Sequence, residues 1–222
     1  MKALVLNSGG IDSTTCVSMA IKKYGAENVV TLTIYYGQKL DKELLSAEKV
    51  AQHYKIPHYV LNLDSIFKNS KCSLIKGGNE VVHKTYEEQK DSIISSYVPF
   101  RNGLFISAAV SFGLSLNDNK PFEIWLGSHA DDFSYADCSN EFSSAMCKAV
   151  QEGTYHLVDF VYPLKNMTKA DVVKTGLELK TPYELTWSCY EGGDKPCGQC
   201  ASCLCRRKAF ELNGVNDPAL ED

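Results

Sequence analysis

The chain has 222 residues, of which 44% are hydrophobic, and it carries a formal net charge of -4 at pH 7. This length allows one domain with a real hydrophobic core, and the acidic balance argues against direct binding of nucleic acid. The chain has no run of about 18 apolar residues, so we expect no membrane span. Its first residues have the pattern of a core strand rather than a signal peptide, which predicts a cytoplasmic protein.

The first third of the chain alternates between strand and helix patterns. Runs of apolar and β-branched residues predict strands at 2–7, 29–36 and 59–63. Apolar residues at helical spacing predict helices at 13–23 and 41–54, between these strands. This order of elements predicts a parallel sheet with right-handed connections.

The rest of the chain extends the same α/β pattern to a fifth strand. The segment 64–97 lacks a clean period, and a loop of this length is typical of a functional lid. Strands are predicted at 122–126 and 158–162, and helices at 103–116, 141–151, 168–179 and 206–212. Thr168 is the expected N-cap of its helix, with Asp171 three residues on. The polar tail 213–222 is expected to fray.

We therefore expect two parts packed together. Residues 1–180 form an α/β domain in which helices sandwich a five-stranded parallel sheet, and residues 181–222 form a small cysteine-rich segment on the same domain. Neither internal repeats nor low-complexity tracts interrupt this organisation.

The first predicted strand runs into a Gly-rich loop, Ser8-Gly9-Gly10-Ile11-Asp12-Ser13, and then into a helix. Two glycines allow close approach of the backbone, successive amides can point at one anion, and the helix adds its positive N-terminal end. The loop has neither the Gly-Lys-Ser/Thr ending of a Walker A loop nor a GxGxxG pattern. It predicts a phosphate site in which Asp12 is a candidate magnesium ligand and Ser13 a hydroxyl donor. An ordinary turn with Asp12 capping the helix is the alternative.

Nine cysteines are unusual for a reducing compartment, where a disulfide framework is not expected. Four of them are spaced C-x7-C-x2-C-x2-C, at Cys189, Cys197, Cys200 and Cys203. Four thiolates at this spacing predict a closed, structural zinc site. An iron–sulfur cluster uses the same ligand set, and buried thiols without metal are the plainest alternative. The place of Cys205, a fifth sulfur, stays open.

Acidic and aromatic residues follow the fourth predicted strand, where α/β sheets bind ligands. The candidates are Asp131, Asp132, Phe133, Tyr135 and Asp137. Rings stack on a planar base and carboxylates accept hydrogen bonds from its N–H groups, although a solvated acidic loop has the same composition. Arg101 can pair with a carboxylate or phosphate, and Lys169 needs an anion near its helix start. Each of these cations is otherwise a surface residue.

Together these segments resemble the 7-cyano-7-deazaguanine synthases, within the ATP pyrophosphatase superfamily whose loop has the pattern SGGxDS. The resemblance covers nearly the whole chain. It rests on Ser8–Ser13 with Thr14-Thr15-Cys16, Tyr36-Gly37-Gln38, Val98–Asn102, Asp132-Phe133-Ser134 with Asp137-Cys138, Pro163-Leu164 with Lys169-Ala170-Asp171, Thr186–Tyr190 and Pro196–Cys203. Three places depart from the family's pattern: Leu40 replaces a histidine, Phe100 stands where glycine is common, and the 132–138 segment is shorter.

The resemblance implies an ATP-dependent ligase that forms C–N bonds. It converts 7-carboxy-7-deazaguanine and ammonia to 7-cyano-7-deazaguanine, through an adenylated carboxylate and an amide, with ATP, Mg²⁺ and Zn²⁺. Its partners are small molecules, and homodimers are usual in the family. The alternatives are an adenylating relative that modifies tRNA or passes the acyl group to another amine, and a zinc-ribbon binding module with a vestigial nucleotide loop.

With this resemblance, the candidate site residues fall into three sets besides the cysteines. The catalytic candidates are Asp12, Ser13, Arg101 and Lys169. The expected ATP contacts are Leu6, Asn7, Ser8, Gly9, Gly10, Asp12, Ser13 and Thr14. The expected substrate contacts are Gln38, Arg101, Asp131, Asp132, Phe133, Tyr135 and Asp137.

Overall fold

The computed structural model describes residues 1–39, 41–79, 97–128, 135–191 and 193–220, and a parallel sheet lies at its centre. The strands are β1 (Ala3–Leu6), β2 (Val29–Tyr35), β3 (His58–Asn62), β4 (Phe122–Trp125) and β5 (Val158–Val161). They lie in the order β3-β2-β1-β4-β5, and every neighbouring pair is parallel. The expected five-stranded parallel sheet is confirmed.

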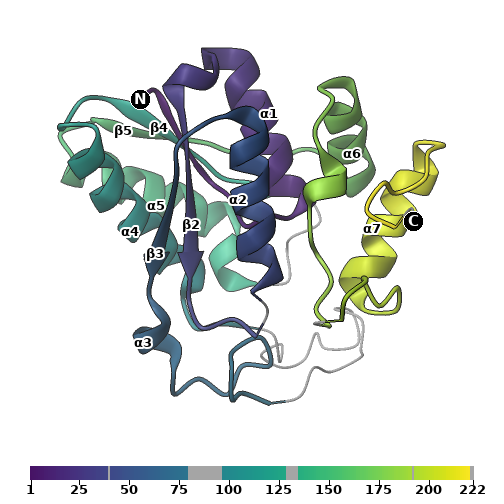
Figure 1. The fold of residues 1–222 in the computed structure, drawn as a ribbon. Helices are drawn as coiled ribbons and strands as arrows, with labels where there is room; N and C mark the ends of the chain where they lie inside the picture. The colour runs from purple at the N-terminus through teal and green to yellow at the C-terminus, as the bar shows by residue number, and fades with distance from the viewer. Residues whose placement is uncertain (40, 80–96, 129–134, 192, 221–222) are drawn as a thin grey trace.

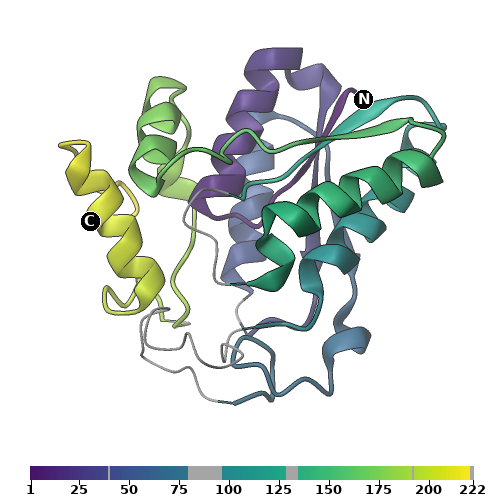
Figure 2. The same ribbon diagram turned by 180° about the vertical axis from the view of Figure 1, so that it is seen from behind.

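Helices cover both faces of this sheet (Figure 1; Figure 2). They are α1 (Ile11–Tyr24), α2 (Lys42–Tyr54), α3 (Asp64–Phe67), α4 (Arg101–Leu116), α5 (Asn140–Gly153), α6 (Lys169–Glu178) and α7 (Ala201–Leu212), with 3-10 turns η1 (Ala26–Asn28), η3 (Ala136–Cys138) and η4 (Tyr183–Leu185). α1 and α2 lie on one face, with α6 beside α1 and α7 beside α6, while α4 and α5 cover the other. None of the described helices combines the length and the apolar character needed to cross a membrane.

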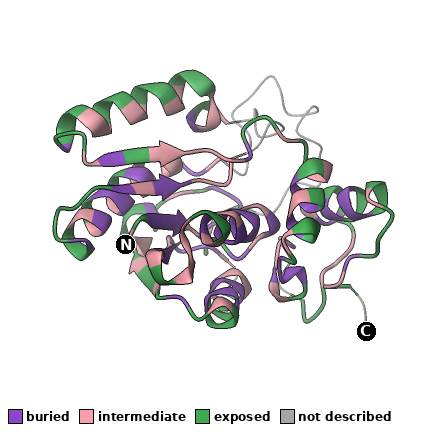
Figure 3. Ribbon diagram, turned by 90° about the horizontal axis from the view of Figure 1, so that it is seen from above, coloured by how far each residue is buried: buried purple, intermediate pink, exposed green. Residues whose placement is uncertain are grey.

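The sheet separates two apolar layers, and β1 contributes to both because successive side chains of a strand point to opposite faces. Ala3 and Val5 pack with the layer under α1, α2 and α6, whereas Leu4 packs with the layer under α4 and α5. A sheet covered on both faces buries both sides of its strands, and Val29–Ile34 of β2 are all buried, the two threonines Thr31 and Thr33 included. Figure 3 shows the buried residues on the sheet and on the helix sides that face it.

The central place of β1 decides where a ligand can bind. The chain places β2 and β3 on one side of β1 and then crosses over to place β4 and β5 on the other. The connections that leave β1 and β4 therefore diverge at the carboxyl edge of the sheet, which is where open α/β sheets bind ligands. The Gly-rich loop follows β1, and the acidic segment follows β4.

Four helices begin earlier than the sequence pattern predicts: α1 at Ile11 rather than 13, α5 at Asn140 rather than 141, and also α4 and α7. α4 begins at Arg101 rather than 103, after Phe100, whose backbone adopts a left-handed conformation with φ +51°. α7 begins at Ala201 rather than 206, with Cys200 at the N-cap. Neither phenylalanine nor cysteine is a usual capping residue, so neither start has a sequence signal. The Thr168–Asp171 capping box of α6 is confirmed.

The expectation that the tail frays is wrong for its described part. Arg206 of α7 forms a buried, two-point ion pair with Asp217, with N–O distances of 2.5 and 2.7 Å. The same guanidinium donates to Thr186 Oγ1 at 2.8 Å and to the Tyr183 carbonyl at 3.1 Å. A polar composition suggested a solvated tail, but a buried arginine needs a counter-charge, and Asp217 supplies it.

We predict that Asp217→Ala lowers the free energy of unfolding by about 3–5 kcal/mol, because it leaves the Arg206 charge buried without its partner. Urea unfolding measures this. Asp118→Ala is the matched control, since the Asp118–Lys120 pair is exposed and 3.8 Å apart and should contribute less than about 1 kcal/mol. Equal effects for the two variants would show that the tail is not anchored by this pair.

Candidate functional site

Gly9 fixes the Gly-rich loop against two other parts of the chain. Its φ of +80° lies in the left-handed region that favours glycine. A Cβ at this position would lie 2.3 Å from the carbonyl oxygen of Glu43 and 2.8 Å from the backbone nitrogen of Ala47, both in α2. On its other side, the Gly9 carbonyl accepts a hydrogen bond from the Trp187 N–H at 2.9 Å. Only glycine fits this position without a shift of α2.

Hydrogen bonds among the loop's own side chains hold its shape. Ser13 Oγ accepts the Ser8 N–H at 3.1 Å and lies 3.1 Å from Asn7 Oδ1. Asn7 Oδ1 also accepts the Gly9 N–H at 3.0 Å. The first amides of α1, which follow Gly10, have no acceptor within the helix. They are available to an anion at the positive end of the helix.

The remaining predicted ATP contacts are less accessible. Leu6 is the last residue of β1, and Asn7 is only 2% exposed. Thr14 is fully buried in α1, and its hydroxyl has no hydrogen-bond partner in the part of the chain that the structure describes. The accessible surface of the loop therefore consists of Ser8, Gly10 and Asp12.

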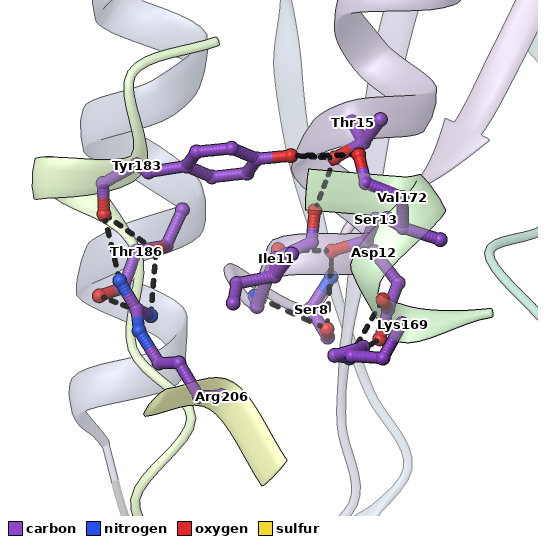
Figure 4. Close-up of polar contacts among 11 residues, drawn as sticks. Ser8, Ile11, Asp12, Ser13, Thr15, Lys169, Val172, Tyr183, Thr186 and Arg206 are labelled. Atoms are coloured by element: carbon purple, nitrogen blue, oxygen red, sulfur yellow. Dashed lines mark hydrogen bonds and ion pairs between the residues drawn. The ribbon is translucent and has the colours of Figure 1, made fainter. Parts of the chain in front are cut away.

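Asp12 and Lys169 form a close ion pair between two helix starts (Figure 4). Lys169 Nζ lies 2.7 and 2.5 Å from the two carboxylate oxygens, and the side chains are 18% and 26% exposed. Lys169 is the first residue of α6, where a cation opposes the helix dipole. The anion that such a lysine needs is Asp12, so both candidates belong to one site.

Tyr183 ties α6 to α1 behind this ion pair. Its hydroxyl lies 2.7 Å from Thr15 Oγ1 and donates to the Val172 carbonyl at 3.1 Å. A Cβ at Gly176 would lie 1.8 Å from the same hydroxyl, so glycine is required there. Figure 4 shows the tyrosine lying between the Arg206 cluster and α1. The C-terminal segment therefore supports the geometry of the loop.

Arg101 occupies the start of α4 at the same edge of the sheet. Its Nη1 donates to the Tyr36 hydroxyl at 3.4 Å, and its guanidinium lies over the rings of Tyr36 and Phe105 at 5.5 and 5.8 Å. Burial raises the pKa of Tyr36, although Arg101 acts in the opposite direction. No carboxylate lies within 4.0 Å of Arg101 among the residues that the structure describes. Arg101 is therefore a candidate receptor for an anion.

Two predicted substrate contacts are engaged within the protein. Gln38 is 6% exposed, and its side-chain oxygen accepts the Tyr36 N–H at 2.8 Å. Asp137 is 7% exposed and accepts the Asn102 N–H of α4 at 2.9 Å. Asn102 in turn donates to the Asp137 carbonyl at 3.1 Å. Asp137 thus fixes the helix start that carries Arg101.

Tyr135 lies at the end of the acidic segment, and its ring is nearly parallel to that of Tyr97. The ring centroids are 6.4 Å apart and the planes differ by 22°. The Tyr97 hydroxyl accepts the Phe100 N–H at 3.0 Å, which holds it beside α4. Asp131, Asp132 and Phe133 lie outside the described residues, as does Leu40.

The four cysteines come together as their spacing predicts. The sulfurs of Cys189, Cys197, Cys200 and Cys203 all lie within 4.8 Å of one another. Backbone N–H groups point at them: Cys189 Sγ accepts from Glu191 and Cys197, each at 3.3 Å. Such a set fits a tetrahedral metal ion with thiolate ligands. Cys205 lies on the exposed side of α7 and is not part of this group.

Sequence reasoning gave no site role to Tyr36, Glu43 or Tyr97, although Tyr36 lies in a segment that carries the resemblance. Glu43 is the second residue of α2, and burial raises its pKa to about 7, against the effect of Arg101. No motif marked it, because a glutamate in the first turn of a helix is ordinary. Its place beside the loop depends on how α2 packs on Gly9, which the local sequence does not reveal.

We predict that Gly9→Ala lowers the free energy of unfolding by about 1–3 kcal/mol, because the added Cβ would overlap the backbone of α2. Gly153→Ala is the control, since nothing lies within 4 Å of a Cβ there. That substitution should be neutral or should stabilise α5 slightly. Chemical denaturation of both variants is the measurement, and a neutral Gly9→Ala would contradict the close approach.

Comparisons with known proteins agree with this geometry. A family model described as "Queuosine biosynthesis protein QueC" matches residues 2–214. The 7-cyano-7-deazaguanine synthase of Archaeoglobus fulgidus is 41% identical over 100% of this chain and 91% of its own length. The synthase of the same name from Caldicellulosiruptor saccharolyticus is 38% identical over 98% of this chain and 94% of its own.

Solved structures with this fold are more distant. NMN synthetase from Francisella tularensis has a TM-score of 0.51 and 16% identity, covering 97% of this chain and 78% of its own. The U34-tRNA thiolase NcsA from Methanococcus maripaludis, solved with its [4Fe-4S] cluster, has a TM-score of 0.53 and 14% identity, covering 96% and 65%. At such identity these likenesses concern the fold alone. The family match over nearly the whole length and the identity to the curated synthases show that this chain belongs to the QueC family of queuosine biosynthesis proteins.

Proposed function

We propose that this enzyme converts 7-carboxy-7-deazaguanine, ammonia and two ATP to 7-cyano-7-deazaguanine, with release of two AMP and two pyrophosphate. The observation that carries the proposal is the Gly-rich loop after β1, whose first helix amides are available to an anion, with the Asp12–Lys169 pair beside it, in a chain of this family. A carboxylate is a poor electrophile until its oxygen becomes a good leaving group. Transfer of AMP to that oxygen provides one, and the protein needs only to position the reactants and stabilise charge near phosphorus.

The phosphate loop would hold the pyrophosphate part of ATP. The first amides of α1 and the Ser8 hydroxyl offer donors there, and Gly10 leaves room for the phosphates. Lys169 supplies a positive charge within the same few ångströms as Asp12. It would stabilise the negative charge that gathers on pyrophosphate as the bond to the α-phosphate breaks.

Asp12 is the residue that would hold Mg²⁺. Its carboxylate lies at the loop, remains 26% exposed and has the hard oxygen ligands that this ion prefers. When bound, the ion would neutralise charge on the phosphate oxygens of ATP. Lys169 holds both oxygens of this carboxylate at the loop.

Arg101 would receive the carboxylate of the deazaguanine. It is a partly buried cation with no carboxylate within 4.0 Å among the described residues, and it lies at the carboxyl edge of the sheet. Tyr135 remains a proposed stacking partner of the base, together with Phe133, Asp131 and Asp132 of the acidic segment. For Gln38 and Asp137 we now propose supporting roles, because their side chains already serve Tyr36 and the start of α4.

The four-cysteine group would hold one structural Zn²⁺. All four ligand positions are filled by protein, so water has no open position at the ion. Its contribution would be to fold the segment from which Trp187 reaches Gly9. A homodimer remains the expected assembly for a member of this family.

We predict that Asp12→Asn lowers the rate of substrate-dependent AMP formation by at least about 100-fold. The neutral asparagine side chain cannot replace the negative charge that the metal and Lys169 need. Mass spectrometry of reactions with ATP, ammonium and the carboxy-deazaguanine measures AMP, amide and nitrile together. Asp118→Asn, an exposed aspartate far from the loop in sequence, should match the parent. Near-normal turnover by Asp12→Asn would reject the assignment, and a different acyl product would identify an acyl-transferring relative.

We also predict one zinc per chain, lost in Cys200→Ser and retained in Cys147→Ser. Cys147 lies on α5, outside the four-cysteine group. Metal analysis of the purified proteins is the measurement, and the cysteine-to-serine loss should destabilise the C-terminal segment. Iron with a visible charge-transfer band in the parent would identify a cluster in place of zinc.

A further inference from the structure

Glu43 is a carboxylate that the proposed reaction has not yet used. It is the second residue of α2 and only partly exposed. Its carboxylate has no hydrogen bond or ion pair among the residues that the structure describes. Acidic side chains that lose contact with water normally gain such partners. An unpaired one at a ligand-binding edge is therefore available to a ligand.

The surroundings of Glu43 place it between the phosphate loop and Arg101. Its own carbonyl oxygen lies against Gly9 of the loop. Its carboxylate interacts through space with Arg101 of α4 and with Tyr36, which follows β2. Arg101 and Glu43 nevertheless form no ion pair within 4.0 Å.

The other charged groups near this helix start are directed elsewhere. Asp41 pairs with Lys76 at 3.2 Å. Lys42 donates to the Gly193 carbonyl and lies 4.5 Å over the Trp187 ring, on the side of the C-terminal segment. Arg101 is thus the charge that acts on Glu43. Burial raises the pKa of Glu43 to about 7, and Arg101 moderates that rise. A group with such a pKa can accept and release protons near neutral pH.

The second half of the proposed reaction requires a proton acceptor. The amide oxygen attacks the α-phosphorus of ATP, the bond to pyrophosphate breaks, and one N–H proton leaves to give an adenylated imidate. The C–O bond then breaks with its electrons on the AMP oxygen. The electrons of the remaining N–H bond form the third C–N bond, and the second proton leaves. Each turnover of amide to nitrile therefore releases two protons from nitrogen.

We propose that the Glu43 carboxylate accepts the N–H proton of the adenylated imidate as the nitrile forms, opposite Arg101. This inference rests on the proposed function and assigns a catalytic residue within it. In the proposed function, the Gly-rich loop holds the pyrophosphate part of ATP, and Arg101 lies where the carboxylate or amide oxygen of the substrate would bind. Glu43 lies beside the loop through its backbone carbonyl and is close enough to Arg101 to be affected by its charge, so the proposal assigns it the nitrogen on the same carbon.

The test begins from the amide rather than the carboxylate, and follows nitrile formation with ATP between about pH 5.5 and 8.5. The active form of Glu43 is the carboxylate, so the parent's rate should rise with pH through about 7. Glu43→Gln should lower the rate by at least about 100-fold and remove this rise. Given the carboxylate substrate, ATP and excess ammonium, the same variant should accumulate the amide. Glu48→Gln, an exposed position on the same helix, should match the parent throughout.

Four results would overturn the inference. In the first, Glu43→Gln converts the amide at the parent's rate with the same pH dependence. In the second, the variant's release of pyrophosphate with the carboxylate substrate falls as much as its conversion of the amide, which would indicate a general positioning role. If Glu43→Gln does not fold, Glu43→Asp keeps an acid at the position and should retain the pH-dependent rise at a lower rate; a flat profile would contradict the role. A parent that forms neither amide nor nitrile would refute the proposed function itself, and the inference with it.

Discussion

The close approach of three backbones at Gly9 is the constraint on which the rest of the site depends. The carbonyl of Glu43 and the amide of Ala47 in α2 leave no space for a side chain there, and the Trp187 N–H holds the loop from the other side. The Gly-rich loop after β1 is therefore packed between α2 and the C-terminal segment. The four-cysteine group is joined to the loop through Trp187, whose indole N–H donates to the Cys189 carbonyl at 3.0 Å.

The first turns of four helices lie at the edge of the sheet where this loop is packed. Asp12 and Glu43 are the second residues of α1 and α2, and Arg101 and Lys169 are the first residues of α4 and α6. Acids at helix starts are favoured by the helix dipole and cations are disfavoured. The two cations therefore need anions, and Lys169 has Asp12. Arg101 has no carboxylate within 4.0 Å in the described part of the chain; its neighbours there are the Tyr36 hydroxyl, Tyr135, Cys138 and the more distant Glu43. Lys169 is thus paired with a carboxylate, whereas Arg101 is not paired with one in the described part of the chain, and this arrangement suits the binding of an anionic substrate.

The fold and the grouping of the four cysteines were predictable from sequence because their signals are local. Strand and helix periods, the glycines of the loop and the spacing of the cysteines all act over a few residues. The rest depends on contacts between distant segments. Asp217 was expected in a frayed tail, but it is buried in an ion pair with Arg206. The substrate contacts of Asp137 and Gln38 stay predictions, and the contacts of their side chains with Asn102 and Tyr36 had no signal in the sequence. Glu43 had no signal, because its burial comes from the packing of α2 on the loop.

The central claim is that substrate oxygen, rather than water, attacks the α-phosphorus of both ATP molecules beside the Ser8–Ser13 loop. Carboxy-deazaguanine labelled with heavy oxygen on both carboxylate atoms tests this directly, by mass spectrometry of the AMP that is released. One labelled oxygen should appear in each AMP, and none in pyrophosphate or water. Unlabelled AMP, or ADP and phosphate in place of AMP and pyrophosphate, would contradict the claim.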